Sequence, residues 1–331
     1  MKIKHHNNSF FELKDLKNDT IVFDPWIGDM IDTGTWSYPN MSSNKRILNL
    51  INPNLIYISH LHTDHYDIQI LSKYTNKKNT KILIKKFKDQ RLKNKLLSLG
   101  YSKIIELEVW KTFDFKGYEL TIVPCDQMVN SGISGQIQYD LDTSIIVYNK
   151  NSNVCFYNHV DNPCSSKIIK AVKIFCKKKY GKIDIVSMAP RSACEYPQMF
   201  LSIKDESKKK ILKEINLKSF INTNRNLKIL SAKNYIPAGG NFILYGKFSH
   251  HQKFVAHPTI EQMDNFFKKT NFNYFNIDNC GHVELRNGKV TSYLKGKKIN
   301  ENIFLKEGIL KKKKYEYQKI NSIKKIDVYF E

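Results

Sequence analysis

Side chains that could bind metal are concentrated between His60 and His65, in a His-x-His-x-Asp-His motif. In an extended segment, side chains two positions apart face the same way, so His60 and His62 are able to reach one cation. Asp64 and His65 lie where the chain would enter a helix, and they are able to hold a second cation beside the first. Imidazole and carboxylate groups bind zinc or iron in proteins at about 2.0–2.2 Å. The motif therefore predicts two divalent metal ions, Fe or Zn, with Asp64 as both ligand and catalytic residue.

Asp161 is the first candidate for the ligands that this motif lacks. A two-metal site needs further ligands from later loops at the same ends of the strands, and Asp161 follows a predicted strand at 154–157. One interpretation is a carboxylate that bridges both metals. The alternative is a cap for a helix that begins near Pro163. We favour the bridge, because both roles place an aspartate directly after a strand and the motif demands a bridging ligand.

The elements that must position these residues are strands mixed with helices. The metal motif follows the apolar run 55–58, which is typical of a strand buried on both faces. Hydrophobic patterns predict further strands at 9–13, 20–23, 81–84, 104–109, 113–115, 118–123, 144–148, 154–157, 183–188 and 235–237. Helical spacing predicts helices at 87–97, 165–177 and 204–217. This order favours an α/β (α+β) fold in which two sheets pack face to face with helices outside.

The chain has 331 residues and no internal repeat or low-complexity linker, so we expect one domain over residues 1–260. Residues 261–331 are expected to form a basic C-terminal extension packed on or near that domain. The reason is that the chain is dense in lysine from about Lys295 and has its longest charge run at Lys311–Lys314. Such a run is typical of a solvated surface or a loose tail.

The composition limits the compartment and the partners. Lysine and arginine number 54 against 31 acidic residues, a formal net charge of +23, but only five of the 54 are arginine. Arginine is the residue that forks onto phosphate and guanine, so nucleic acid is not an expected partner. The N-terminus lacks the apolar segment of a secretory signal, and no apolar run approaches the roughly 18 residues of a membrane span. Six scattered cysteines are typical of reduced thiols. We expect a soluble cytoplasmic protein with no membrane partner.

The motif resembles that of the metallo-β-lactamase superfamily, and the resemblance covers roughly residues 10 to 260. It implies an αββα sandwich, which matches the predicted order of strands and helices. Within the superfamily, the chain is most similar to the metal-binding half of the CMP-N-acetylneuraminate hydroxylases. The similar segments are Asp24-Pro25-Trp26 with Trp36, Ser59–His65, Asp140–Thr143, Asn158–Asp161, Ser192–Pro197 with Met199-Phe200, and Pro237–Gly240.

Two departures from the resemblance affect the expected chemistry. Those hydroxylases carry a Rieske iron–sulfur domain, whose paired Cys and His ligands this sequence does not supply, so electrons would come from a separate donor. The superfamily usually has a third histidine on the first metal, but here no histidine occurs between His65 and His159. Asp126, Asp140 and Asp142 are the only carboxylates in the right stretch. We expect Asp140, four residues before the strand 144–148, to replace the histidine, and the other two to be turn or strand-entry carboxylates.

The resemblance also implies a last ligand after a late strand. Pro237–Gly240 stands at the expected place without a histidine, so His250, His251 or His257 would have to fold back, and we choose His250. Arg191 and Ser192, after the predicted strand 183–188, are expected to hold a phosphate or carboxylate of the substrate. The alternative is that Arg191 is an ordinary surface residue.

A carboxylate in place of the third histidine makes the ligand set harder and favours iron or manganese over zinc. Together with the resemblance, it implies O₂-dependent hydroxylation of a small-molecule substrate, a sugar nucleotide or a sialic-acid-like compound. The alternative is a metal-dependent hydrolase of a phosphoester or amide, which needs no electron donor. A nucleic-acid-processing enzyme is a third alternative, in which the positive charge would serve a phosphate backbone.

Overall fold

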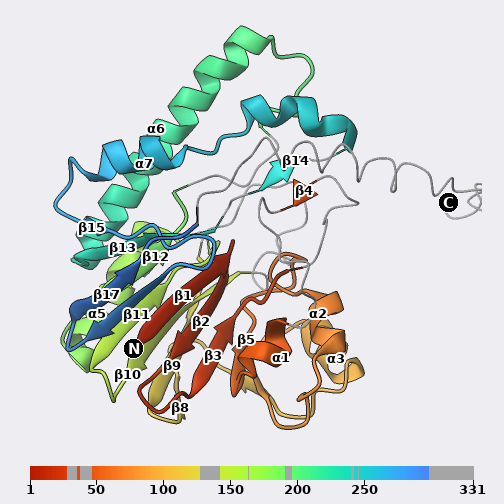
Figure 1. The fold of residues 1–331 in the computed structure, drawn as a ribbon, viewed down its shortest axis with the longest axis vertical. Coiled ribbons are helices and arrows are strands. Elements are labelled where there is room, and N and C mark those ends of the chain that lie inside the picture. The colour runs from red at the N-terminus through yellow and green to blue at the C-terminus, as the bar shows by residue number, and fades with distance from the viewer. Residues whose placement is uncertain are drawn as a thin grey trace, which may run out of the picture.

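The computed structural model describes residues 1–27, 36–37, 47–126, 142–162, 164–190, 196–239, 242–244 and 246–297. Their strands form two large sheets and one small one (Figure 1). The first sheet has the order β17 (Lys289–Leu294), β16 (His282–Arg286), β1 (Lys2–Asn7), β2 (Phe10–Lys14), β3 (Thr20–Phe23), β5 (Leu55–Tyr57), β6 (Lys81–Lys85) and β7 (Ile104–Leu107). The second has the order β15 (Asn273–Tyr274), β13 (Asn234–Pro237), β12 (Ile185–Met188), β11 (Val154–Asn158), β10 (Thr143–Asn149), β9 (Tyr118–Pro124) and β8 (Thr112–Phe115). The small sheet pairs β14 (Ile243–Leu244) with β4 (Trp36–Ser37).

The two large sheets pack against each other through alternate side chains of their strands. Phe11, Phe23 and Tyr57 face inward from the first sheet and meet Ile122 and Phe156 of the second in one buried cluster. The neighbours of these residues along each strand face the other way, because successive side chains in a strand alternate between its faces. Each sheet therefore has a second apolar face that other elements must cover.

Helices cover these outer faces. Those on the first sheet are α1 (Ile47–Ile51), α2 (Ile68–Lys73) and α3 (Arg91–Ser98), which share a buried cluster with β3, β5 and β6. Those on the second sheet are α5 (Ser166–Tyr180), α6 (Asp205–Leu230) and α7 (Ile260–Phe267). A 3-10 helix, η2 (Gly246–Phe254), packs near β14. The result is the layered αββα sandwich expected from the sequence. None of the helices in the described ranges has the length and apolar character needed to span a membrane.

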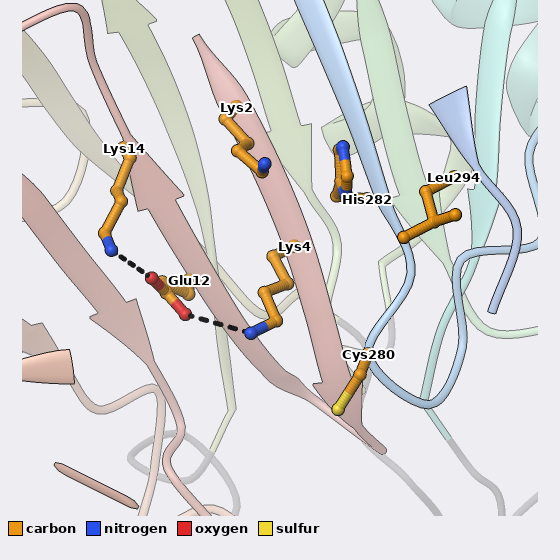
Figure 2. Close-up of a pocket in the computed structure, with 7 residues that line it drawn as sticks. All are labelled: Lys2, Lys4, Glu12, Lys14, Cys280, His282 and Leu294. Carbon is orange, nitrogen blue, oxygen red and sulfur yellow. Dashed lines mark ion pairs between the residues drawn. The ribbon is translucent and has the colours of Figure 1, made fainter. Parts of the chain in front are cut away.

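The outer face of β1, β2 and β16 carries a hollow of about 330 Å³ (Figure 2). It is lined by Lys2, Lys4, Glu12, Lys14, Cys280, His282 and Leu294. Glu12 lies between two lysines, with Nζ of Lys14 at 3.0 Å and Nζ of Lys4 at 3.9 Å. The ring of His6 donates to the same carboxylate at 2.9 Å. The lysines of this face are therefore partly neutralised by a buried acid.

Three strands of the first sheet were not predicted from the sequence. The second half of β1 reads His5-His6-Asn7, which is polar, yet all three side chains are buried. β16 and β17 carry exposed charged residues and lie within the predicted basic extension. Residues 261–297 of that extension contribute β15 to the second sheet and β16 and β17 to the first. Residues 298–331 lie outside the described residues.

Candidate metal centre

The metal motif lies where strand ends of both sheets meet. β3 and β5 run parallel in the first sheet, as do β11, β12 and β13 in the second. The loop after β5 carries His60–His65, and the loop after β11 carries Asp161. Asp142 directly precedes β10, which is antiparallel to β11 and so begins near the end of β11. Sites built at the ends of neighbouring strands are common in folds of this kind, because loops are free to vary while strands fix them.

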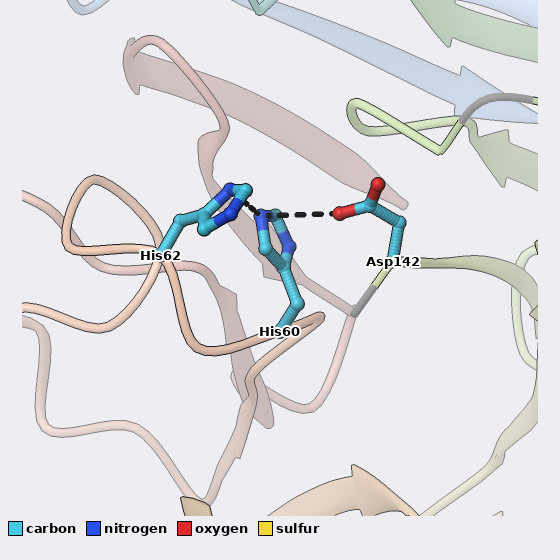
Figure 3. A group of neighbouring side chains, drawn as sticks. All are labelled: His60, His62 and Asp142. Carbon is cyan, nitrogen blue, oxygen red and sulfur yellow. Dashed lines mark hydrogen bonds and ion pairs between the residues drawn. The ribbon is translucent and has the colours of Figure 1, made fainter. Parts of the chain in front are cut away.

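His60, His62 and Asp142 form the first group of metal-ligating side chains (Figure 3). Nε2 of His60 lies 2.8 Å from Nδ1 of His62 and 3.3 Å from Oδ1 of Asp142. One potential ligand atom from each residue lies within 4.8 Å of the others. His60 is buried, Asp142 is half-buried and His62 is exposed. The group is thus compact enough for one cation and open on the side of His62.

Asp142 is held at this place by the hydroxyl groups of its neighbours. Thr143 donates from its hydroxyl to the backbone oxygen of Ser59 at 2.8 Å, and it accepts from the hydroxyl of Tyr57 at 2.6 Å. These buried hydrogen bonds join the start of β10 to the end of β5 across the two sheets. Because Thr143 follows Asp142 and Ser59 precedes His60, the same bonds bring the carboxylate to the imidazole.

Asp64, His65 and Asp161 form the second group. Nε2 of His65 lies 3.2 Å from Oδ2 of Asp161 and 3.3 Å from Oδ2 of Asp64. The rings of His60 and His65 have their centroids 4.1 Å apart, so the two groups are adjacent. Each group therefore offers three potential ligand atoms to one of two neighbouring cations.

Two residues behind the histidines fix their orientation. Ser59 donates from its hydroxyl to Oδ2 of Asp24 at 2.8 Å and from its backbone nitrogen to Oδ1 at 2.7 Å. Nδ1 of His65 donates to Oδ2 of Asp24 at 3.0 Å. The Ser59 hydroxyl donates its single proton to Asp24. It therefore accepts a hydrogen bond from Nδ1 of His60, which lies 2.9 Å away. Both rings thus keep Nε2 for the site, as metal-binding histidines require.

The electrostatics of the site call for bound cations. Asp24, Asp64, Asp142 and Asp161 lie together, and among the described residues no lysine or arginine forms an ion pair with any of them. Oδ1 of Asp161 is buried and has no hydrogen-bond partner within the described chain. The protein as a whole has a net charge of +23, but its described lysines and arginines do not pair with these four carboxylates. The donors present therefore fit two divalent metal ions, which would supply the absent positive charge.

The pKa values reflect the same concentration of charge. Burial and then the nearby charge of Asp161 raise the pKa of the Asp142 carboxyl to about 7. Burial lowers the pKa of His60 well below its usual value. Burial acts in the same direction on His65, but the carboxylates of Asp64, Asp161 and Asp24 outweigh it and raise the pKa of that ring well above its usual value. A metal ion would take the place of the proton that these carboxylates hold on His65.

Two residues beside the site have left-handed backbone conformations. Asp24 has φ of 42° and Val160, directly before Asp161, has φ of 54°. A β-branched residue in this region is strained, and such strain persists only where the surroundings enforce it. Gly239, in the segment after β13, has φ of 94°, and a Cβ at this position would lie 3.2 Å from Oδ1 of Asp161. Gly239 therefore approaches the site through its backbone.

The structure brings together five of the residues predicted from the sequence, namely His60, His62, Asp64, His65 and Asp161. Asp161 does not cap α5, because the hydroxyl of Ser165 does so. His250 is exposed on η2 with its ring against His251, and it is in neither group. Asp140, Arg191 and Ser192 lie outside the described residues, so their roles stay predictions. The carboxylate that lies beside His60 is Asp142.

Three further residues support the site and were not predicted as part of it. Asp24 carries the same signal as His60, since each is a polar residue shortly after a buried strand. Ser59 adjoins the motif. Asn8 donates to Oδ2 of Asp64 at 3.0 Å, but it follows β1, a strand that the sequence did not predict. No local pattern pointed to it.

No family model matches the chain, and no curated protein matches it in sequence. The fold, in contrast, is similar to solved structures. One is described as a possible metal-dependent hydrolase from Veillonella parvula DSM 2008, with a TM-score of 0.59, 14% identity and coverage of 86% of this chain and 99% of the other. Another is an isothiocyanate hydrolase from Delia radicum gut bacteria, with a TM-score of 0.56, 14% identity and coverage of 86% and 100%. CmlA, a diiron β-hydroxylase from Streptomyces venezuelae, matches with a TM-score of 0.51, 13% identity and coverage of 82% and 52%.

These similarities and the layered architecture confirm the αββα sandwich that the sequence predicted. The chain spans nearly the full length of the two hydrolases and about half the length of the hydroxylase. At these levels of identity the similarity describes the fold, and the chemistry must be argued from the site.

Proposed function

We propose that this chain is a metalloenzyme that holds two ions, one between His60, His62 and Asp142 and one between Asp64, His65 and Asp161. The proposal is supported by the distances within each group and by the four carboxylates, which form no ion pair with a lysine or arginine of the described chain. Asp161 has a second oxygen that is buried and unpaired, which suits a carboxylate that serves both ions. The supporting hydrogen bonds from Asp24 and Ser59 keep the histidine nitrogens in the tautomers that ligation needs.

The reaction we favour is O₂-dependent hydroxylation. One observation carries this choice: the first group consists of two histidines and a carboxylate. That set suits iron and leaves positions for other ligands, as in non-haem iron oxygenases. Bound iron would supply the redox chemistry that O₂ requires. Hydroxylation converts R–H, O₂, two electrons and two protons into R–OH and water, so we propose a separate electron-donor protein as a partner.

The protein's own residues would orient the ions and limit access to them. Within the two described groups, His60, Asp64 and His65 are buried and His62 is exposed, so we propose that a substrate approaches from the side of His62. For the substrate we propose a sugar nucleotide or a sialic-acid-like compound, and the support is the resemblance of the sequence motifs to CMP-N-acetylneuraminate hydroxylases. Arg191 and Ser192 are the residues we propose for its phosphate or carboxylate.

Hydrolysis is the second candidate. Its support is that the two structures with the higher TM-scores are described as hydrolases and match this chain over nearly their full length. Two bound cations would supply the Lewis-acid chemistry for a phosphoester or amide substrate. The residues involved would be the same, and no electron donor would be needed.

The experiment that tests the proposal compares Asp142→His with the wild-type protein. Protein purified without oxygen should contain iron at both positions, and Asp142→His should replace iron by zinc in the first, because three histidines suit zinc. O₂ consumption should be lost in this variant. The control is Asp126→Asn, since Asp126 binds Ser165 away from the two groups. Unchanged metal content in Asp142→His would contradict the assignment, and hydrolysis by the zinc-loaded wild type without O₂ consumption would favour the second candidate.

A further inference from the structure

The turn between β1 and β2 reaches the second metal group. Asn8, in this turn, donates from its side-chain amide to Oδ2 of Asp64 at 3.0 Å, and both side chains are buried. Asn8 has φ of 33°, in the left-handed region that asparagine tolerates better than most residues. This hydrogen bond fixes one oxygen of Asp64 and thereby fixes the direction of its lone pairs toward a cation.

His5 holds Asn8 in turn. Nε2 of His5 donates to the backbone oxygen of Asn8 at 2.7 Å, since a carbonyl oxygen only accepts. Nδ1 of the same ring lies 3.3 Å from Oδ1 of Asp278, an ion-pair distance when the ring carries both protons. The backbone of His5 also pairs with the loop after Asp278, through its nitrogen to Gly281 at 3.1 Å and its oxygen to Cys280 at 2.8 Å.

Asp278 has little freedom to move. Its Oδ1 accepts from the backbone nitrogen of Asn279 at 2.9 Å. Gly296, just beyond β17, packs directly against it, and a Cβ at that position would lie 1.6 Å from the backbone oxygen of Asp278. Such an approach is possible only for glycine. A segment late in the chain is therefore rigidly joined to His5.

We propose that Asp278, His5 and Asn8 act as positioning residues for Asp64. Two hydrogen bonds join His5 to Asn8 and Asn8 to Asp64, and the contact between His5 and Asp278 at ion-pair distance extends this series to the loop before β16. None of the three touches the first group in the described structure, so their effect should be confined to one ion. This inference rests on the proposed function, in that it requires Asp64 to bind a metal.

The test measures binding of Co(II) or Zn(II) alone to the full chain by equilibrium dialysis, with no substrate. Asn8→Gly removes the amide and keeps a residue that adopts positive φ freely. We expect the first ion to bind as in the wild type and the second to bind about 10- to 100-fold more weakly. The matched control is Asn18→Gly, because Asn18 is an exposed asparagine with φ of 62° in the turn between β2 and β3. It should bind both ions normally.

A second variant, Asp278→Asn, preserves volume and the acceptor for Asn279 but removes the charge that faces His5. It should weaken the same ion several-fold while thermal unfolding of the metal-free protein shows that it is folded. Two tightly bound ions in Asn8→Gly or an unaffected second ion in Asp278→Asn would overturn this inference alone. A wild-type protein that binds no second ion would overturn the proposed function as well.

Discussion

The carboxylate of Asp24 accepts hydrogen bonds from the ring of His65 and from the nitrogen and hydroxyl of Ser59, and it is fully buried. A carboxylate with three donors around it has a fixed orientation. It therefore aims Nε2 of His65 at Asp64 and Asp161, which lie on the opposite side of the ring. At the scale of single residues, the site depends on this support as much as on the ligands themselves.

Asp24→Asn should weaken the ion of the second group by about 10- to 100-fold. The amide keeps the shape of the side chain, but its NH₂ would face a donor where an oxygen now accepts. The measurement is metal content after dialysis against a graded chelator. The control is Asp67→Asn, another buried aspartate of the region, which caps α2 through Oδ1 and accepts from the backbone nitrogen of Ile27 through Oδ2, so that the same change also removes one acceptor but at a residue outside the two groups. Equal metal retention in the two variants would contradict the role of Asp24.

The candidate ligands were predictable from the sequence to the extent that they are local. His60, His62, Asp64 and His65 share one short motif, and Asp161 follows a strand with a clear apolar pattern. Asp142 lies beside His60 through a contact between distant segments, and Asp140, the carboxylate expected from the sequence, lies outside the described residues. The hydroxyl of Thr143 binds the backbone of Ser59 and places its neighbour Asp142 beside His60. Sequence spacing carries no information on such a bond.

At the scale of elements, the β1–β2 pair combines support for the site with a buried ion cluster on its other face. On the inward face of β1, His5 binds the backbone oxygen of Asn8, and Asn8 binds Asp64 of the candidate metal centre. The outward side chains place Lys14 and Lys4 around Glu12 (Figure 2). His6 lies beside the same carboxylate. β1 escaped prediction because three of its four buried residues, His5, His6 and Asn7, are polar, whereas strand patterns are recognised from apolar residues.

The stability of this pair should depend on pH through Glu12. Burial alone raises the pKa of Glu12, but the hydrogen bond from His6 and the charge of Lys14 lower it from 4.5 to about 2. A carboxyl whose pKa is lower in the folded state stabilises that state above pH 4.5 and loses its effect as the pH falls toward 2. The shift corresponds to about 3 kcal/mol. Urea unfolding of Glu12→Gln should therefore differ from the wild type by about this amount at pH 7, and the difference should shrink as the pH approaches 2.

A constant difference in the free energy of unfolding between Glu12→Gln and the wild type at all pH values would show that Glu12 acts through packing alone.

Helix α6 shows a second element that sequence analysis predicted incompletely. It was predicted to end at 217 but extends to Leu230, because Phe220, Leu227 and Leu230 pack on the second sheet. Lysine and asparagine residues between them hid the periodicity.

At the scale of the whole molecule, the chain closes its first sheet with its last described strands. β16 pairs with β1, and β17 pairs with β16, so the N-terminal strand lies inside the sheet instead of at its edge. The amino group of Met1 donates to the backbone oxygen of Leu285 at 2.7 Å within this seam. The expected boundary near residue 260 followed the extent of the family resemblance, and the lysine density from about Lys295 indicated a basic extension beyond it. The density of charged residues reflects the side of these strands that faces solvent. It gives no information on the buried side, which packs in the core.

Ending the chain after residue 260 should abolish folding and metal binding together. The deletion removes Met263, Phe267, Ile277, Val283 and Leu285, all of which are buried. At about 1.5–3 kcal/mol for each side chain, the loss is roughly 10 kcal/mol, which is comparable to the whole stability of a typical domain. It also exposes the edge of β1 and removes Asp278 from His5. The matched comparison is a chain that ends after residue 297, which keeps every described element and should unfold cooperatively on heating and bind two ions. A chain of residues 1–260 that does the same would instead establish the domain boundary predicted from the sequence, and it would show that the first sheet is stable without its last two strands.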